Sequence, residues 1–279
     1  MDRIVFPAGK AGNILRGAFG KILWGSEDFA RFFPPRRDEG PSGLADPPRP
    51  FVFRAAHLEG SSIEAGKEFY FDVNLFDLSE PLADALTRAC SELAPLGFGT
   101  RRGRAEFISD NSPSAIHSVD LAGGAPCETE VSNLQVRFIT PVELKGQTGS
   151  EIPFGILFAR VRDRIGILSS LYGEGPLELD YRAAGERAAS IRTVSCELQY
   201  NDFSRRSGRT GEVHPIGGFT GVAQYEGELA EFAPWLRAAC WTGVGKHTVW
   251  GNGVIECKAK GRASPLNTPW DDSGGNPAS

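Results

Sequence analysis

A glycine-rich stretch near the end of the chain carries the residues best suited to chemistry. Residues 243–253 read Gly-Val-Gly-Lys-His-Thr-Val-Trp-Gly-Asn-Gly. Glycine tolerates positive φ and lets backbone N–H groups approach a partner closely. Lys246 supplies a fixed cation, His247 a group that titrates near neutrality, and Trp250 an aromatic face for stacking. The combination suits a phosphate chain that carries bases. The alternative is a tight turn with Trp250 in the core, since glycine-rich turns are common.

The stretch does not match the common nucleotide-binding loops. A Walker loop needs Ser or Thr after Gly-Lys, whereas His247 follows Lys246 here. A dinucleotide fingerprint lies between a strand and a helix early in a βαβ unit. This stretch instead follows a predicted helix and precedes a predicted strand.

Two arginine clusters add further cations. The formal net charge of -5 does not by itself indicate a nucleic-acid-binding protein, but the placement of charge matters more than its sum. Both clusters fall in Gly/Ser-rich connections, so each is either a phosphate-binding site or solvated loop charge. The clusters are Arg101, Arg102 and Arg104, and Arg205, Arg206 and Arg209.

The composition bounds the class of protein. The 279 residues suffice for one large or two ordinary domains. No apolar run reaches membrane-spanning length, and the N-terminus does not resemble a signal peptide. We therefore expect a cytoplasmic protein without a membrane partner. The five cysteines form no C-x-x-C pair and the four histidines show no ligand spacing, so we expect neither a metal nor another cofactor.

The first half alternates between helical and strand patterns. Apolar residues such as Leu15, Phe19 and Ile22 repeat at helical spacing, and Arg16 and Lys21 fall on the exposed face of that helix. The predicted elements are a helix over about 13–24, a loop over 34–50, strands at 51–54 and 69–75, a helix from 79 to 97, and a strand at 103–109.

The residue pattern of the second half predicts elements in the order β-α-β-β-α-β, which is typical of a ferredoxin-like unit. Its strands are expected at 134–138, 194–200, 217–225 and 254–258, and its helices at 154–171 and 229–240. We predict an α+β protein with two tandem ferredoxin-like (RRM-like) domains at 1–120 and 131–260. The glycine-rich loop 243–253 precedes the last strand, the first strand of the first domain is short or missing, and 261–279 form a disordered tail.

Four stretches resemble the RAMP superfamily of CRISPR RNA-binding proteins, and within it the CRISPR precursor-RNA-processing endoribonuclease. They resemble the first-helix signature, the strand after the first loop, the basic segment with a glycine-rich strand, and the glycine-rich loop of that family. The stretches are Leu15–Gly20, Pro48–Arg54, Ser204–Arg209 with Ile216–Gly221, and Gly243–Gly253.

The resemblance implies cleavage of CRISPR repeat RNA without a metal. The 2′-OH would attack the adjacent phosphate, which requires a base, an acid and cations. The resemblance also implies other CRISPR effector subunits as candidate partners. The rival interpretations are a non-catalytic RAMP subunit that binds guide RNA, and an unrelated small-molecule enzyme on the same fold.

The catalytic residue does not transfer from the family pattern. Many relatives place a histidine in or just after the first helix, but no histidine precedes His57 here. We expect His247 or His214 to be the general acid or base, with His57 or a site of Lys and Tyr as alternatives. The expected RNA contacts are Arg16, Lys21, Arg101, Arg102, Arg104, Arg205, Arg206, Arg209, Gly243, Gly245, Lys246, Trp250, Gly251 and Gly253.

Overall fold

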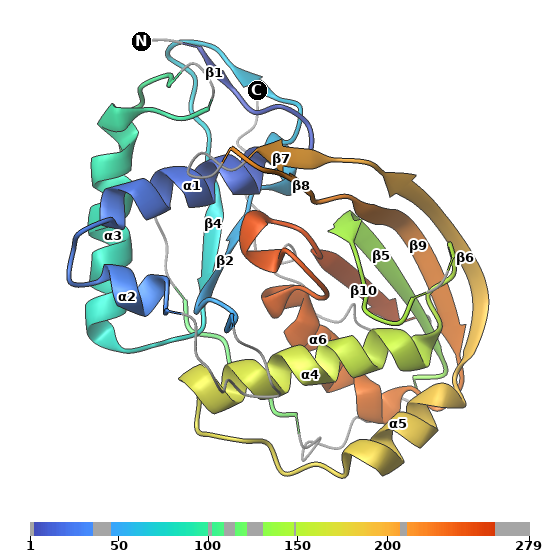
Figure 1. The fold of residues 1–279 in the computed structure, drawn as a ribbon. Helices are drawn as coiled ribbons and strands as arrows, with labels where there is room; N and C mark the ends of the chain where they lie inside the picture. The colour runs from blue at the N-terminus through green and yellow to red at the C-terminus, as the bar shows by residue number, and fades with distance from the viewer. Residues whose placement is uncertain are drawn as a thin grey trace. The chain divides into compact units, whose positions relative to one another are not determined.

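The computed structural model describes residues 3–35, 46–99, 102–108, 115–121, 131–147, 149–206 and 211–259 (Figure 1). Two compact units divide the chain after His117, but residues 166–177 and 249–251 group with the first unit. This grouping differs from the predicted ranges 1–120 and 131–260, because compactness follows packing rather than continuity of the chain. The predicted tail 261–279 lies outside the described residues.

The N-terminal part of the first unit holds two small antiparallel sheets and three α-helices. Strand β1 pairs with β3, and β2 pairs with β4. In chain order the elements are β1 (Ile4–Val5), α1 (Ala11–Leu23), α2 (Phe29–Phe32), β2 (Phe51–Arg54), the 3-10 turn η2 (Ala56–Leu58), β3 (Ser62–Ile63), β4 (Asp72–Leu75) and α3 (Glu80–Leu96).

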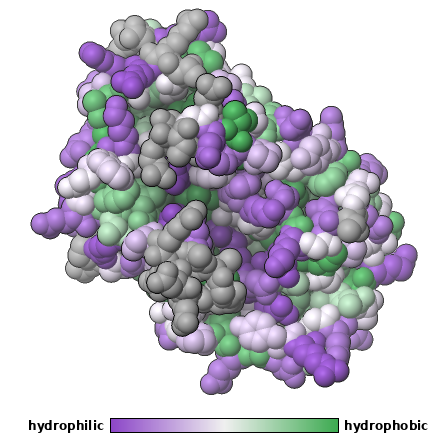
Figure 2. All heavy atoms as spheres, viewed as in Figure 1, coloured by the Kyte–Doolittle hydropathy of each residue, from purple (hydrophilic) through white to green (hydrophobic). Residues whose placement is uncertain are grey.

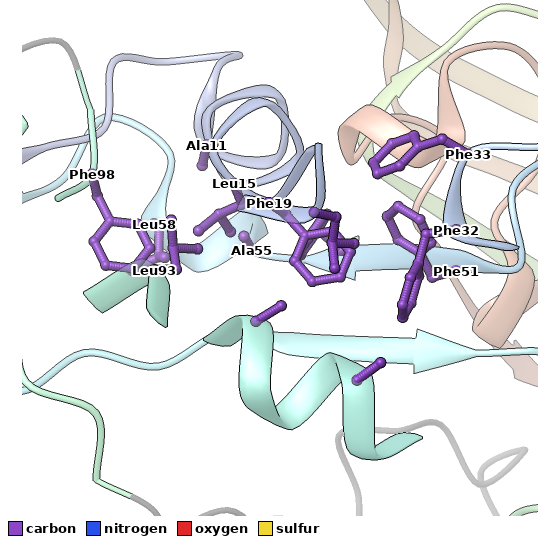
Figure 3. Close-up of a cluster of buried hydrophobic side chains, with 14 of the residues drawn as sticks. Ala11, Leu15, Phe19, Phe32, Phe33, Phe51, Ala55, Leu58, Leu93 and Phe98 are labelled. Atoms are coloured by element: carbon purple, nitrogen blue, oxygen red, sulfur yellow. The ribbon is translucent and has the colours of Figure 1, made fainter. Parts of the chain in front are cut away.

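The core of this unit forms around the apolar face of α1. Leu15, Phe19 and Leu23 recur every four residues and are all buried, as the helical periodicity predicts. The ring of Phe19 packs edge-on against Phe32 at 5.0 Å and against Phe51 at 5.5 Å (Figure 3). This aromatic packing holds α1 against α2 and β2.

The start of α1 is capped from a distant turn. Glu59 accepts hydrogen bonds from the backbone N–H groups of Lys10 at 2.9 Å and Ala11 at 3.0 Å. These amides lack partners inside the helix, and a carboxylate also complements the positive end of the helix dipole. Glu59 therefore fixes where the arginine-bearing helix begins.

The second unit contains a four-stranded antiparallel sheet in the order β10-β5-β9-β6. A separate hairpin pairs β7 with β8. The elements are β5 (Asn133–Val142), α4 (Phe154–Tyr172), α5 (Tyr181–Ala189), β6 (Arg192–Asn201), β7 (Ser204–Arg206), β8 (Val213–Pro215), β9 (Gly218–Glu226), η4 (Ala230–Phe232), α6 (Ala233–Thr242), η5 (Thr248–Trp250) and β10 (Ile255–Ala259).

Aromatic residues also form the core of this unit. Phe158 packs against Phe232 at 4.6 Å, and Phe154 packs against Tyr225 at 5.2 Å. The hydroxyl of Tyr225 donates a 2.8 Å hydrogen bond to the carbonyl of Ile152, which satisfies its buried polar end.

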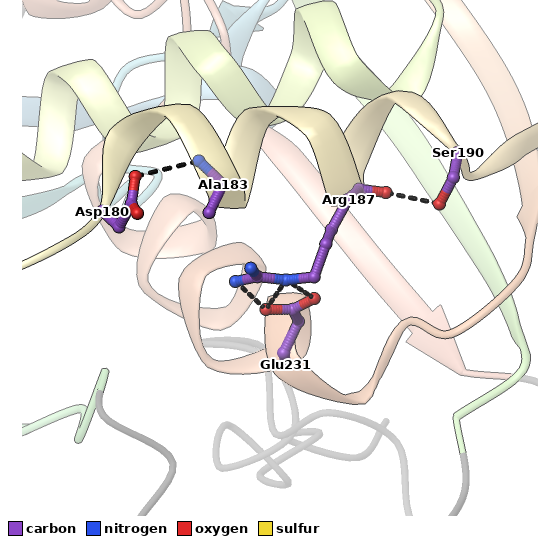
Figure 4. Close-up of polar contacts among 5 residues, drawn as sticks. All are labelled: Asp180, Ala183, Arg187, Ser190 and Glu231. Carbon is purple, nitrogen blue, oxygen red and sulfur yellow. Dashed lines mark hydrogen bonds and ion pairs between the residues drawn. The ribbon is translucent and has the colours of Figure 1, made fainter.

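Helix α5 was not predicted, because its buried residues, Ala184 and Ala188, have small side chains that give a weak apolar signal. Polar contacts secure it (Figure 4). Asp180 accepts hydrogen bonds from the amides of Arg182 and Ala183 at 3.1 and 2.9 Å, a typical N-cap. Near the other end, Arg187 pairs with Glu231 through contacts of 2.7 to 2.9 Å.

The α+β class is confirmed by the helices and antiparallel sheets. The predicted strand at 103–109 is wrong: within 102–108, a single bridge from Gly103 to Phe98 is the only strand-like pairing. An alternating sequence needs a partner strand to form a ladder, and this segment has none over its described length. Arg205 and Arg206 were expected in a connection but lie in β7.

The surface viewed in Figure 2 mixes hydrophilic and hydrophobic side chains. Within the ranges that the structure describes, no helix has the length and apolar character needed to cross a membrane.

Candidate functional site

The glycine-rich loop is an ordered, closed turn between α6 and β10. Its four predicted glycines all have positive φ, between 71° and 89°. The amide of Val244 donates to the carbonyl of Gly253 at 2.9 Å, and the amide of Gly253 donates to the carbonyl of Pro141 at 2.9 Å. The loop is therefore held against the end of β5.

Gly245 shows why the loop needs glycine. Its φ is 83°, and a Cβ placed there would lie 2.6 Å from the carbonyl oxygen of Glu143. The next amide, that of Lys246, donates to this same oxygen at 3.1 Å. A side chain at Gly245 would thus disturb the contact that positions Lys246 and His247.

Lys246 forms an ion pair with Glu143. Its Nζ lies 2.5 Å from Oε1 of Glu143, and the two side chains are 54% and 46% exposed. Such exposed pairs contribute little, about 0–1 kcal/mol. A phosphate could therefore displace the carboxylate at small cost.

His247 adopts a left-handed backbone conformation with φ of 63° and is half-buried. Across the described ranges, Arg102, with φ of 49°, is the one other non-glycine residue with positive φ. Residues held in sparsely populated conformations cluster at functional sites, although histidine tolerates this region better than most residues. Both outliers belong to the predicted site.

Within the first unit, Trp250 packs with α1. The guanidinium carbon of Arg16 lies 5.9 Å from the Trp250 ring centroid and 5.2 Å from that of Phe33. Gly12 permits this packing, since a Cβ there would lie 2.4 Å from the carbonyl oxygen of Trp250. The prediction that Arg16 is exposed is wrong: the aromatic rings attract its cation and leave it half-buried.

Lys21 and Arg102 line one groove of the first unit, between α1 and α3. The groove has a volume of about 340 Å³ and an apolar lining that includes Ile14, Ala18 and Leu93. Arg104 is exposed, while Arg101 and Arg209 lie outside the described residues. The structure thus brings two predicted cations, Lys21 and Arg102, to one surface.

His214 lies on β8, directly opposite Arg205 in the strand register. Its Nε2 is 3.7 Å from Oε2 of Glu212, a contact that becomes an ion pair when the histidine is protonated. The hairpin therefore places a half-buried histidine beside the strand that carries Arg205 and Arg206. The spacing along the chain does not reveal this pairing, because the two residues lie on different strands.

His57 makes two contacts with Tyr70 that its position in the sequence does not predict. Its ring stacks on Tyr70 with centroids 4.3 Å apart, and Nε2 lies 2.8 Å from the carbonyl oxygen of Tyr70. A carbonyl only accepts, so the neutral imidazole carries its proton on Nε2 and leaves Nδ1 as an acceptor. Nearby, partial burial raises the pKa of the Asp72 carboxyl, against the opposing charges of His57 and Arg54.

The described residues were also compared with the side-chain groupings that hold metal ions. No group of three or more His, Cys, Asp or Glu side chains among these residues is arranged to hold an ion.

Comparison with known proteins finds one family model that matches part of the chain. The family model for CRISPR-associated endoribonuclease Cas6 matches residues 136–255, which include the sheet strands β9 and β6, the hairpin and the glycine-rich loop. No curated protein matches the sequence.

Solved Cas6 structures share the fold. A product complex of the Thermus thermophilus Cas6 TTHB231 has 16% identity and a TM-score of 0.54, and the match covers 91% of this chain and 95% of that chain. A product complex of the Cas6 TTHA0078 has 21% identity and a TM-score of 0.52, covering 92% and 98%. A partial Cas6-RT-Cas1–Cas2 complex has 12% identity and a TM-score of 0.55, covering 96% of this chain and 46% of that chain.

These structures support the fold, and the sequence match within residues 136–255 supports the family. This chain therefore shares the fold of solved Cas6 structures, and its residues 136–255 match the family model of the CRISPR-associated endoribonuclease Cas6.

Proposed function

We propose that this chain is a metal-independent endoribonuclease that cleaves CRISPR repeat RNA in precursor transcripts and releases mature guide RNA. The observation that carries the proposal is the Cas6 family match over residues 136–255. Fold similarity extends to structures titled as a Cas6 product complex and a Cas6 substrate mimic complex. The cleaving step is attack of the 2′-OH on the adjacent phosphate, which leaves a 2′,3′-cyclic phosphate and a 5′-OH.

We further propose that both halves are ferredoxin-like domains. In the second unit, β5, β6, β9 and β10 are the first to fourth strands, so the sheet order β10-β5-β9-β6 is fourth-first-third-second. Two helices join the strands at the ferredoxin-like positions, with α5 as an addition. The first half carries only part of this pattern: the two-residue β1 pairs with β3, β2 pairs with β4, and a single bridge from Gly103 to Phe98 stands where a fourth strand is expected.

For the chemistry, His247 is proposed as the general acid or base, with Lys246 neutralising charge on the phosphate. His214 is the second candidate, next to the basic strand β7. The tight backbone of the loop favours His247, because it holds the imidazole on a fixed main chain. The proposed RNA contacts are the glycines of the loop, Arg16, Lys21, Trp250 and the two arginine clusters.

The test is a cleavage assay on a transcript that contains the repeat, run in EDTA. A discrete cut with a 2′,3′-cyclic phosphate supports the proposal. A substrate with a single 2′-deoxy nucleotide just upstream of the scissile phosphate should bind but resist cleavage, since the nucleophile is absent. A shift without a cut would instead indicate a guide-RNA-binding subunit. Cleavage of the deoxy substrate would refute the 2′-OH mechanism.

The proposed partners follow from the same likeness. A Cas6 module occurs in a structure titled as a Cas6-RT-Cas1–Cas2 complex, so CRISPR proteins are candidate partners of this chain as well as repeat RNA.

A further inference from the structure

Trp24, directly after α1, is an exposed aromatic residue that the site described above does not use. Its side chain is 74% exposed. Hydrophobic residues are scattered over the viewed surface, so exposure alone does not mark a site (Figure 2). The argument for Trp24 rests on what supports its ring and which charges surround it.

A series of aromatic contacts connects Trp24 to the interior of the first unit. Trp24 meets Phe29 edge-on at 4.9 Å and 77°, and Phe29 stacks on Phe33 at 5.1 Å and 27°. The guanidinium of Arg16 then covers Phe33 and faces Trp250. The exposed ring is therefore the outer end of a packed series that includes two predicted RNA contacts, Arg16 and Trp250.

The backbone around Trp24 is also fixed. The amide and the hydroxyl of Ser26 both donate to the carbonyl of Leu23, at 2.9 and 2.7 Å. The amide of Phe29 donates to the carbonyl of Ser26 at 3.2 Å. A ring held this way loses little conformational entropy when it stacks on a ligand, which favours binding.

The charges near Trp24 include an exposed cation on the preceding turn of α1. Lys21 precedes Trp24 by three residues, is exposed, and makes no ion pair with another residue that the structure describes. On the carboxylate side, Asp28 pairs with Arg88 at 3.3 Å, which leaves Glu27 as the neighbouring exposed acid. An aromatic platform beside a cation is the usual means of holding single-stranded nucleic acid.

We propose that Trp24 stacks on an unpaired base of the repeat RNA while Lys21 contacts an adjacent phosphate. This inference rests on the proposed function, because it adds a binding position for the same RNA. The contact should tolerate any base, since every base presents a π-face. It is a binding position and takes no part in proton transfer.

The experiment measures the affinity of the full chain for a repeat RNA made uncleavable by a 2′-deoxy nucleotide. Trp24→Ala should weaken binding about 5- to 100-fold, the range expected for one base–aromatic stack. Trp24→Phe should restore most of the affinity. Leu78→Ala, which removes another exposed apolar side chain of the same unit, should leave it unchanged. Thermal unfolding of each variant checks that the fold is retained.

Abasic nucleotides placed one at a time along the RNA locate the partner base. One abasic position should weaken binding to the wild type but not to Trp24→Ala, since the stack is already lost in that variant. Equal affinity of Trp24→Ala and wild type, or the lack of any coupled position, would overturn the inference while the proposed function stands. A wild-type protein that neither binds nor cuts the repeat RNA would overturn both.

Discussion

The positive charge of Lys246 is paired with the carboxylate of Glu143. Glu143 supplies both the carbonyl that holds the Lys246 amide and the carboxylate that holds its Nζ. The same residue thus positions the lysine and competes with a phosphate for it. Residues next to a candidate cation therefore determine how much of its charge an anionic ligand meets.

The first prediction concerns this competition. Glu143→Gln should tighten RNA binding by about 2- to 5-fold at low salt, because exposed ion pairs are worth about 0–1 kcal/mol. The backbone carbonyl stays in place, so the position of the loop should be unchanged. A titration of labelled repeat RNA measures the effect. In a Lys246→Ala background, Glu143→Gln should increase RNA affinity much less. An equal increase in both backgrounds would show that the carboxylate repels RNA without acting through Lys246.

The second prediction concerns His247. Its positive φ makes alanine a poor probe, since alanine disfavours that conformation, whereas asparagine tolerates it. His247→Asn should lose about 10²–10⁴-fold in the rate of cleavage with little change in RNA affinity, because asparagine does not transfer the proton. Single-turnover kinetics measure the rate. If His247→Asn cuts normally while the matched His214→Asn does not, the proton-transfer role belongs to His214.

At the scale of elements, α1 combines packing with the placement of functional groups. Its apolar face builds the core of the first unit, Arg16 faces two aromatic rings, and Lys21 lines a groove. Glycine at position 12 lets the backbone of Trp250 approach the helix. Residues 249–251 and α1 therefore depend on each other for their geometry within the first unit.

The third prediction compares two glycines of α1. A Cβ at Gly12 would lie 2.4 Å from the Trp250 carbonyl, whereas a Cβ at Gly17 would meet nothing within 4 Å. Gly17→Ala should stabilise the protein by up to about 1 kcal/mol, the difference in helix propensity. Gly12→Ala should destabilise it by about 1–3 kcal/mol, since the backbone must shift. Urea unfolding measures both. Equal effects would mean that the approach of Trp250 to Gly12 is not close in solution.

At the scale of the whole molecule, the formal charge is -5 although the proposed ligand is a polyanion. The cations proposed to bind RNA must therefore act locally, and RNA affinity should depend strongly on salt. The free energy of unfolding should also depend on pH, because folding partly buries ionisable carboxyl groups such as that of Glu59.

The fourth prediction is a pH dependence of stability. Burial raises the pKa of Glu59 above its ordinary value of 4.5, although hydrogen bonds from Lys10, Ala11 and Gly9 oppose the shift. The folded protein then binds this proton more tightly than the unfolded chain does. Glu59 therefore contributes stability that is present below the unfolded pKa and lost as the pH rises through the folded pKa. Thermal unfolding across this window should show the loss.

Glu59→Gln removes the titrating group and should remove that fall in stability. Glu68→Gln, which removes the same formal charge from an exposed position in the same unit, reports the effect of net charge alone. If both variants change the pH profile alike, the fall does not come from the buried carboxyl of Glu59.

The sequence alone determined the elements whose patterns are local. Helix α1 follows from the spacing of Leu15, Phe19 and Leu23, and β5 and β6 follow from alternation, because burial of one face imposes a period on the chain. The special conformation of the glycine-rich loop is also readable, since glycine is the residue that adopts positive φ without strain.

Contacts between residues far apart in the chain were decided by the tertiary structure. The pairing of Lys246 with Glu143, the cover of Arg16 over Trp250 and the stack of His57 on Tyr70 join elements whose approach no local period encodes. Helix α5 also depends on such contacts, since Arg187 pairs with Glu231 on a helix whose buried side chains are small alanines. Sequence periodicity reports which face of an element is buried, whereas the partner on that face is selected only when the chain packs.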